Sequence, residues 1–154
     1  ARPRSRVGFD RSEMRWKRPG RPSPLTQTIR RDSDVILARQ LGRKLAEQMG
    51  FSRPDQALIA TAISELARNI VVYAENGTVE LTEITHRQRV GLQLVVTDRG
   101  PGIPDLQSAL ADGFSTGNSL GLGLPGTRRI MDEFDIQSVA GEGVTVTAIK
   151  WKHR

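Results

Sequence analysis

The chain has 154 residues, of which 37% are hydrophobic and 26% are charged, a composition typical of one globular domain. No apolar run approaches the roughly 20 residues that span a bilayer, and the absence of cysteine excludes disulfides and thiolate metal sites. We therefore expect a cytoplasmic protein without a membrane partner.

The formal net charge of +6 is concentrated near the N-terminus. Residues 1–31 carry ten Arg and Lys residues against two acidic ones, whereas the remainder carries 13 basic and 15 acidic residues. Residues 1–24 also contain four prolines, which oppose regular structure. We predict a basic, disordered tail over residues 1–24 and one domain over residues 25–154. Binding of the tail to nucleic acid is an alternative that we do not favour.

The domain is predicted to begin with a strand over residues 25–29 and a helix that ends near residue 49. Asp32 or Ser33 can cap this helix, and Gly50 ends it. Leucines at four-residue spacing predict its buried stripe, namely Leu37, Leu41 and Leu45.

A second helix is predicted from the capping sequence of residues 52–55 through residue 74. It has a broad apolar face made of Leu58, Ile59, Ala62, Ile63, Leu66 and Ile70. Glu65 and Asn69 lie four residues apart, so both project from the margin of this face, one turn from each other.

The remaining pattern predicts two hairpins separated by helices. Strands are expected over residues 78–85, 90–97, 134–139 and 144–151, and helices over residues 105–112 and 122–134. This order favours an α+β, two-layer sandwich in which a mixed, mostly antiparallel sheet carries helices on one face.

Two glycine-rich loops follow the strand that ends at Asp98, over residues 98–102 and 117–123. Glycines let backbone N–H groups approach an anion, and the second loop opens a predicted helix, whose first amides favour phosphate. Neither loop is a P-loop or a dinucleotide fingerprint.

These loops and the second helix together meet the needs of a nucleotide site. A carboxylate at Asp98 can accept a hydrogen bond from the exocyclic amine of adenine. The side-chain oxygen of Asn69 suits Mg²⁺, which prefers a few protein oxygens plus phosphate and water. Glu65 can accept a proton from a group that attacks the γ-phosphate.

At this point the sequence resembles a known superfamily. Glu65-x-x-x-Asn69, Asp98-x-Gly100-x-Gly102 and Gly121-x-Gly123 are similar to the N, G1 and G2 boxes of the GHKL ATPases and kinases, which share the Bergerat (histidine-kinase-like ATPase) fold. Over about residues 25–152, the stretches SELARN, DRGPGIPD, DGFSTG, GLPG, MDEF and VAGEG resemble the RsbT-type serine/threonine switch kinases of the bacterial stressosome.

The resemblance implies a role for each matching residue. Glu65 would be the general base, Asn69 the Mg²⁺ ligand and Asp98 the acceptor for adenine. Further ATP contacts are implied for the first loop and the phosphate-side lid, at Gly100, Gly102, Ile103, Gly117, Leu120, Gly121, Leu122 and Gly123. Where the superfamily usually has a Thr that contacts adenine through water, this chain has Val144, followed by Thr145. Thr145 is retained as a candidate, although a regular strand would direct it to the opposite face.

The implied function is an ATP- and Mg²⁺-dependent protein serine/threonine kinase of a partner-switching stress response. Such kinases phosphorylate STAS-domain partners and, once released, bind and activate a PP2C-type phosphatase. An anti-sigma factor kinase of the RsbW or SpoIIAB type, and a docking module without kinase activity, remain the alternatives.

Overall fold

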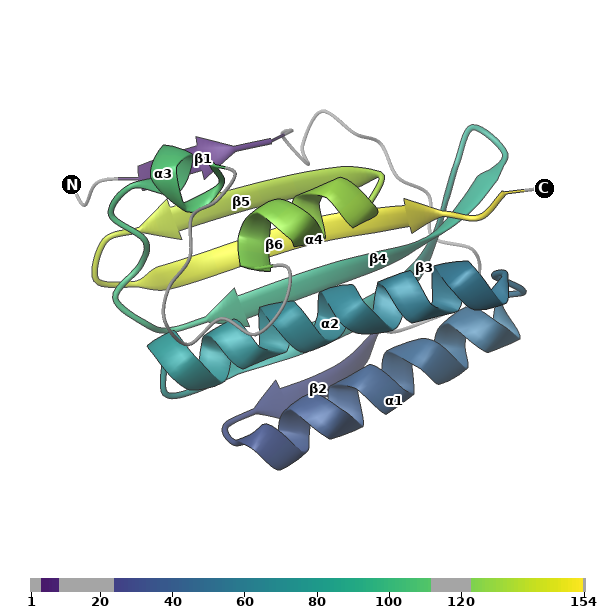
Figure 1. Cartoon of the computed structure of the whole chain (residues 1–154), viewed down its shortest axis with the longest axis horizontal. Helices are drawn as coiled ribbons and strands as arrows, with labels where there is room; N and C mark the ends of the chain where they lie inside the picture. The colour runs from purple at the N-terminus through teal and green to yellow at the C-terminus, as the bar shows by residue number, and fades with distance from the viewer. Residues whose placement is uncertain (1–3, 9–23, 112–122, 154) are drawn as a thin grey trace.

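The computed structural model describes residues 4–8, 24–111 and 123–153 (Figure 1). Within these residues six strands form one sheet in the order β1-β5-β6-β4-β3-β2, and every pair is antiparallel. The elements in chain order are β1 (Arg4–Val7), β2 (Leu25–Ile29), α1 (Asp32–Gln48), α2 (Arg53–Tyr73), β3 (Gly77–His86), β4 (Arg89–Asp98), α3 (Leu106–Ala109), α4 (Gly123–Ile130), β5 (Glu133–Val139) and β6 (Gly143–Trp151).

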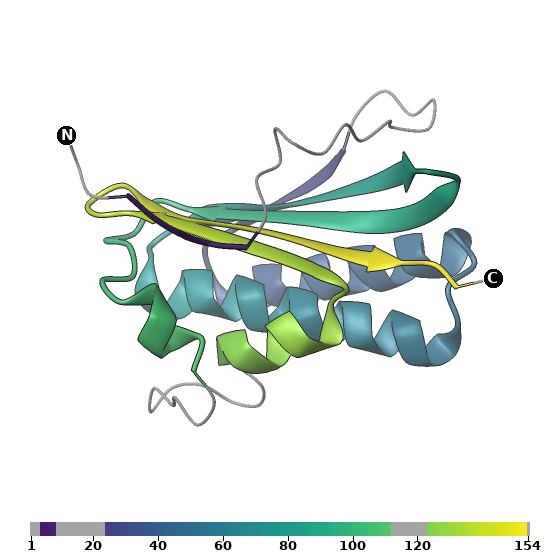
Figure 2. The ribbon, with the colours of Figure 1, turned by 90° about the horizontal axis from the view of Figure 1, so that it is seen from above.

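The helices lie on one face of the sheet, which gives the molecule two layers (Figure 2). The predicted α+β sandwich is therefore confirmed, and the predicted domain strands agree with the structure to within one residue at each end. The sheet is antiparallel throughout rather than mixed, and tight turns join β3 to β4 and β5 to β6. In the first turn Arg87 and Gln88 adopt positive φ values of 49° and 66°, as a two-residue hairpin requires.

The prediction of a disordered tail is wrong for Arg4–Val7, which forms β1 and pairs with β5. The expectation rested on prolines, and none lies within these four residues. The tail prediction for residues 9–23 falls outside the described part of the chain.

The buried face of α1 differs from the predicted leucine stripe. Leu45 is 4% exposed, but Leu37 is 49% exposed. The buried residues of this helix are Val35, Ala38, Gly42, Leu45 and Ala46. A Cβ atom on Gly42 would overlap the side chain of Ile63, so the small residues allow α1 to approach α2 closely.

The start of α1 also differs from the prediction, because Asp32 already lies inside the helix and Arg31 is the N-cap. The carboxylate of Asp34 accepts hydrogen bonds from the backbone N–H groups of Arg30 at 2.9 Å and Arg31 at 3.2 Å. Gly50 follows the helix with a positive φ of 85°, which confirms its role in ending the helix.

The predicted start of α2 is confirmed, and so is its predicted apolar face except at Leu58, which is only half-buried. The hydroxyl of Ser52 accepts a hydrogen bond from the N–H of Asp55 at 3.2 Å. Ile59, Ala62, Ile63, Leu66 and Ile70 are buried in the main core, between this helix and the sheet. Among the described residues, no helix combines the length and apolar content needed to cross a membrane.

The two later helices are shorter than predicted. α3 spans only Leu106–Ala109, and Asp105 is its N-cap, with a side chain that accepts a hydrogen bond from the N–H of Ser108. α4 ends at Ile130 because the chain turns into β5 at Glu133. The predicted ends at residues 112 and 122 lie outside the described residues.

The difference between the two leucines of α1 is testable. We expect Leu45→Ala to lower the free energy of unfolding by about 2–5 kcal/mol, because the change leaves a cavity in the core. Leu37→Ala on the same helix is the matched control and should change it by no more than about 0.5 kcal/mol. Urea unfolding followed by circular dichroism measures both values, and equal losses would contradict the observed packing of α1.

Candidate functional site

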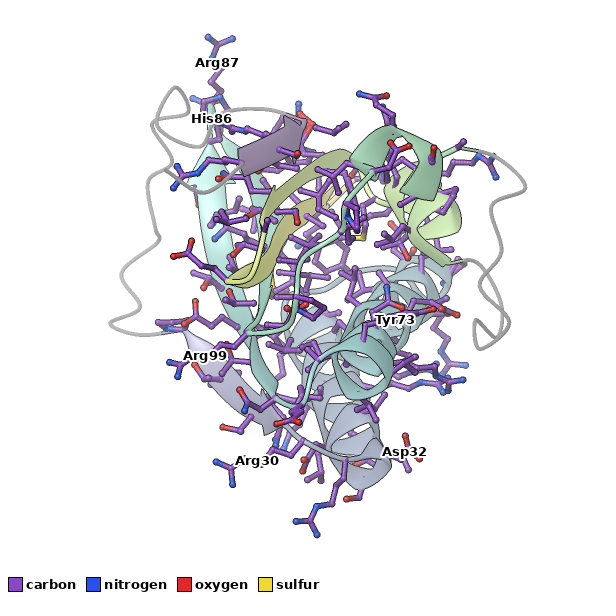
Figure 3. The ribbon with its side chains drawn as sticks, turned by 90° about the vertical axis from the view of Figure 1, so that its left-hand side faces the viewer. Arg30, Asp32, Tyr73, His86, Arg87 and Arg99 are labelled. Carbon is purple, nitrogen blue, oxygen red and sulfur yellow. The ribbon has the colours of Figure 1, made fainter. Side chains whose placement is uncertain are left out.

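A pocket of about 260 Å³ lies where α2, the end of β4, the loop that follows it and α4 meet. A larger and more open hollow of about 600 Å³ lies beside Trp151, and another of about 660 Å³ adjoins the pocket and shares Tyr73 with it. The smaller pocket is the one that brings the predicted residues Asn69 and Asp98 together. Its lining residues are Asn69, Tyr73, Asp98, Ile103, Pro104, Ala109, Gly123, Leu124, Pro125, Ile136 and Val144. Figure 3 looks at this end of the molecule, where Tyr73 and Arg99 are labelled.

Asp98 is the central acidic group of the pocket. One of its oxygens, Oδ1, accepts hydrogen bonds from the N–H of Gly100 at 2.9 Å and from the N–H of Val144 at 3.2 Å. Within the described part of the chain the other oxygen, Oδ2, has no hydrogen-bond partner. Burial raises the pKa of Asp98 above its ordinary value, and the two amide hydrogen bonds oppose that rise.

The loop after Asp98 is fixed to the sheet at several points. The N–H of Ile103 donates to the hydroxyl of Ser138 on β5 at 2.7 Å, and the N–H of Gly141 donates to the carbonyl of Pro101 at 3.0 Å. Gly102 has a φ of +87°, and a Cβ there would lie 2.9 Å from Oγ of Ser138. Glycine at this position therefore allows both the turn and the close approach to β5.

Gly100 has a packing role in this loop rather than a place in the pocket lining. A Cβ on Gly100 would lie 2.8 Å from the Cβ of Ala74 at the end of α2. The loop thus sits directly against the helix that carries Asn69.

α2 presents three polar residues at one-turn intervals, namely Glu65, Asn69 and Tyr73. Asn69 and Tyr73 line the pocket. Glu65 is 8% exposed and does not line it, and its carboxylate has no hydrogen-bond partner among the described residues. Sequence reasoning missed Tyr73, although its position four residues after Asn69 was the available signal.

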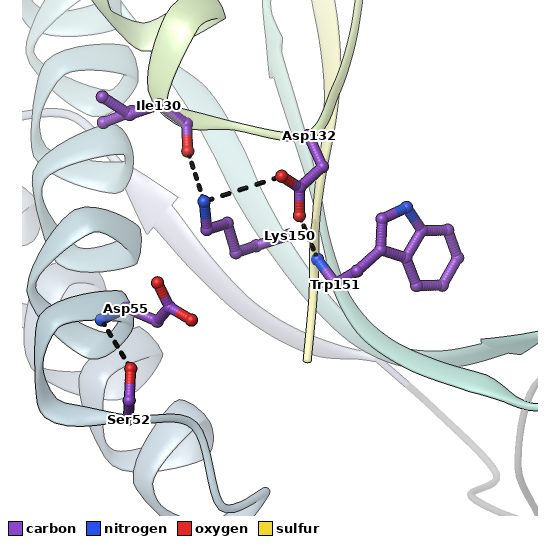
Figure 4. A network of polar contacts seen from close by, with 6 residues as sticks. All are labelled: Ser52, Asp55, Ile130, Asp132, Lys150 and Trp151. Carbon is purple, nitrogen blue, oxygen red and sulfur yellow. Dashed lines mark hydrogen bonds and ion pairs between the residues drawn. The ribbon is translucent and has the colours of Figure 1, made fainter. Parts of the chain in front are cut away.

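The opposite wall of the pocket is the start of α4, formed by Gly123, Leu124 and Pro125. The far end of the helix is anchored by Lys150, whose ammonium donates to the carbonyl of Ile130 at 2.8 Å and lies 3.7 Å from Oδ1 of Asp132 (Figure 4). A cation at a helix C-terminus is favourable because it offsets the unpaired carbonyls.

Comparisons with known proteins agree with this geometry. Residues 30–150 match the family described as the histidine kinase-like ATPase domain. The chain belongs to the histidine kinase-like ATPase family.

Two curated relatives extend the family assignment. The chain is 53% identical over 118 residues to the serine/threonine-protein kinase RsbT of Bacillus subtilis, a match that covers 77% of this chain and 89% of the relative. It is 28% identical over 129 residues to the anti-sigma F factor of Caldanaerobacter subterraneus, covering 80% of this chain and 89% of the relative. The predicted resemblance to RsbT-type kinases is confirmed.

Among solved structures, the catalytic domain of the histidine kinase ThkA is 17% identical and has a TM-score of 0.49. That match covers 83% of this chain and 96% of the ThkA domain.

The residues that the family resemblance selected are placed as follows. Asn69, Asp98, Ile103 and Gly123 come together in the pocket lining, while Glu65 lies one turn along α2 from Asn69. Val144 lines the pocket and Thr145 does not, because side chains alternate along β6 and Thr145 pairs with Thr97 and Gln137. The candidate lid residues Gly117, Leu120, Gly121 and Leu122 lie outside the described residues.

The donor set of the pocket fits the nucleotide that an ATPase domain uses. Asp98 offers a desolvated carboxylate with one oxygen unengaged within the described residues, which suits an amine donor such as that of adenine. Asn69 offers one amide oxygen, which suits Mg²⁺ only together with phosphate and water ligands.

The pKa of Asp98 leads to a prediction about stability. A pKa raised by folding means that ionisation opposes folding. The loss of folding free energy is absent below the ordinary aspartate pKa of about 3.9, where the carboxyl is protonated in both the folded and the unfolded state. It develops as the pH rises through the raised pKa of the folded state. Asparagine can accept the same two amide hydrogen bonds without burying a charge.

We therefore expect Asp98→Asn to be at least as stable as the wild type at about pH 7, with the difference shrinking toward about pH 4. Urea unfolding at a series of pH values measures this. A variant that is markedly less stable than the wild type at neutral pH would contradict the assigned burial of the carboxylate.

Proposed function

We propose that this chain is an ATP- and Mg²⁺-dependent protein serine/threonine kinase of a bacterial partner-switching pathway. The observation that carries the proposal is that Asp98 and Asn69 line one pocket, with Glu65 one turn along α2 from Asn69, in a chain that is 53% identical to a kinase of this class. A strand end would thus supply nucleotide recognition at Asp98, and the helix beside it would supply the carboxylate of Glu65.

Asp98 would accept a hydrogen bond from the amine of adenine through Oδ2, since Oδ1 already accepts two from the backbone. Tyr73, which is 46% exposed at the mouth of the pocket, offers an aromatic face to the nucleotide. Asn69 would hold Mg²⁺ with phosphate oxygens and water, and the ion would neutralise phosphate charge.

Glu65 would act as the general base. It would accept the proton of the substrate Ser or Thr hydroxyl as that oxygen bonds to the γ-phosphorus and the bond to the ADP oxygen breaks. Its place on α2, one turn from Asn69, supports this role, because a rigid helix would hold the carboxylate close to the phosphate that the metal binds.

The proposed partners are those that the resemblance to RsbT-type switch kinases implies, and not ones that the pocket selects. The chain would phosphorylate STAS-domain stressosome proteins in the cytoplasm and then bind and activate a PP2C-type phosphatase; the 53% identity to a serine/threonine-protein kinase supports the kinase part of this proposal. The match to anti-sigma F factors favours a second candidate, an anti-sigma factor kinase, because it extends over 80% of this chain.

The kinase proposal is tested by phosphate transfer from labelled ATP, with Mg²⁺, to a co-encoded STAS-domain protein. We expect transfer by the wild type and a decrease of at least about 100-fold for Glu65→Gln, which keeps the shape of the side chain but cannot take the proton. Glu47→Gln, at an exposed position on α1, is the matched control and should retain full activity.

Transfer by Glu65→Gln at the wild-type rate would contradict the role of Glu65. ATP binding by the wild type without transfer to any STAS-domain protein would favour the docking module, and transfer only to an anti-sigma antagonist would favour the second candidate.

Nucleotide recognition is tested separately by calorimetry. We expect Asp98→Asn to lose detectable ATP binding while it remains folded, because the amide presents a donor toward the donor of the base. The control is Asp105→Asn. Asp105 lies outside the pocket lining, and asparagine can still serve as the N-cap of α3, so this variant should bind ATP normally. Retained ATP binding by Asp98→Asn would overturn the adenine assignment.

A further inference from the structure

β1 pairs with the part of β5 that forms a wall of the pocket. Val7 lies opposite Ile136, which lines the pocket, and Ser5 lies opposite Ser138, whose hydroxyl holds the backbone of Ile103. Without β1, the strand that carries these two contacts would be an edge of the sheet.

β1 also reaches the pocket through α3, which it contacts on the helical side of the sheet (Figures 1 and 2). Val7 packs against the main core together with the buried residues Leu106 and Leu110. Ala109 of the same short helix lines the pocket. A four-residue strand thus supports two walls of the pocket at once.

A charged pair fixes β1 in place on the opposite face of the sheet. Nε of Arg6 donates to Oδ1 of Asp135 at 2.9 Å, and Asp135 is only 1% exposed. Removal of Arg6 would leave a buried carboxylate without this cation, which is strongly unfavourable. Arg4 lies on the same face of the strand and is exposed like Arg6, but it forms no ion pair with a described residue.

Gly8 completes the attachment of β1. Its φ is +124°, and a Cβ at this position would overlap the backbone of Phe134 and Asp135. Any side chain here would push the end of β1 away from β5, and its Cβ would also lie 2.8 Å from Oδ1 of Asp135. Gly8 therefore offers a second way to disturb the strand while Arg6 keeps its own side chain.

β1 lies outside residues 30–150, which match the histidine kinase-like ATPase family. We propose that β1 is nevertheless a working part of the nucleotide site, and that Arg6 and Asp135 are positioning residues that hold β5 and α3 in the ATP-binding arrangement. The proposal rests on ATP binding at the pocket described above.

The proposal has a quantitative form. If the pocket binds ATP only while β1 is docked, the apparent Kd rises in proportion as the docked fraction falls. By reciprocity, bound ATP must strengthen the docking of β1. Two independent readouts therefore follow, the Kd for ATP and the protection of the β1 amides from hydrogen exchange.

The experiment measures the Kd for ATP with Mg²⁺ by calorimetry on full-length variants, well below their melting temperatures. We expect Arg6→Ala and Gly8→Ala each to raise the Kd by about tenfold, with Arg6→Lys largely restoring it. Arg4→Ala is the matched control and should stay within about twofold of the wild type. In the wild type, ATP should slow amide exchange over residues 4–7.

A Kd for Arg6→Ala equal to that of Arg4→Ala, or exchange of residues 4–7 that is insensitive to ATP, would overturn the inference and leave the kinase proposal intact. A wild-type protein that binds no ATP would overturn both. Lower stability of Arg6→Ala with an unchanged Kd would show that the pair serves folding only.

Discussion

The oxygen Oδ1 of Asp98 joins three segments of the chain. It receives the amide of Gly100, two residues along the loop, and the amide of Val144 at the start of β6. The end of β4, the loop and the next strand are thereby held by one acceptor that the fold has partly removed from water. Because the backbone engages Oδ1, the side chain cannot turn away, and Oδ2 stays available to a ligand. The rise in the pKa of Asp98 has the same origin, since burial disfavours its charge.

A second set of contacts makes the pocket depend on the far edge of the sheet. Ser138 on β5 holds Ile103, so the loop after Asp98 is tied to two different strands. β5 is in turn enclosed between β6 and β1, and the contact between Arg6 and Asp135 spans 129 residues of sequence. Removing the cation from a carboxylate buried at such a site is strongly destabilising. The short strand β1 therefore has a structural connection to residues that line the pocket.

The fold was predictable where the signals are local. The cap at Ser52, the hairpin turns and the alternating strands each depend on neighbouring residues, so the sequence predicted them closely. The packing of α1 was not predictable in this way, because its leucines and its small residues recur at similar helical spacing. Only the contact of Gly42 with Ile63 selects the face with small residues. β1 was missed for a related reason, since four residues gain strand structure only from β5 and from Asp135.

The candidate site was likewise predictable where its residues follow a local pattern, and not where they depend on contacts between distant segments. Helical spacing predicted that Glu65 and Asn69 share one face of α2. The structure places Asn69 in the pocket lining, with Tyr73 one turn further along, whereas Glu65 lies outside the lining. The alternation along β6 puts Val144 in the lining, where its side chain can form no hydrogen bond. The other described lining residues are apolar or glycine, except for Asn69, Tyr73 and Asp98, whose side chains can form hydrogen bonds. If Asn69 serves the metal, polar recognition of the base depends mainly on Asp98. A partly desolvated carboxylate suits this role, because a hydrogen bond to a charged acceptor gains strength where water is excluded.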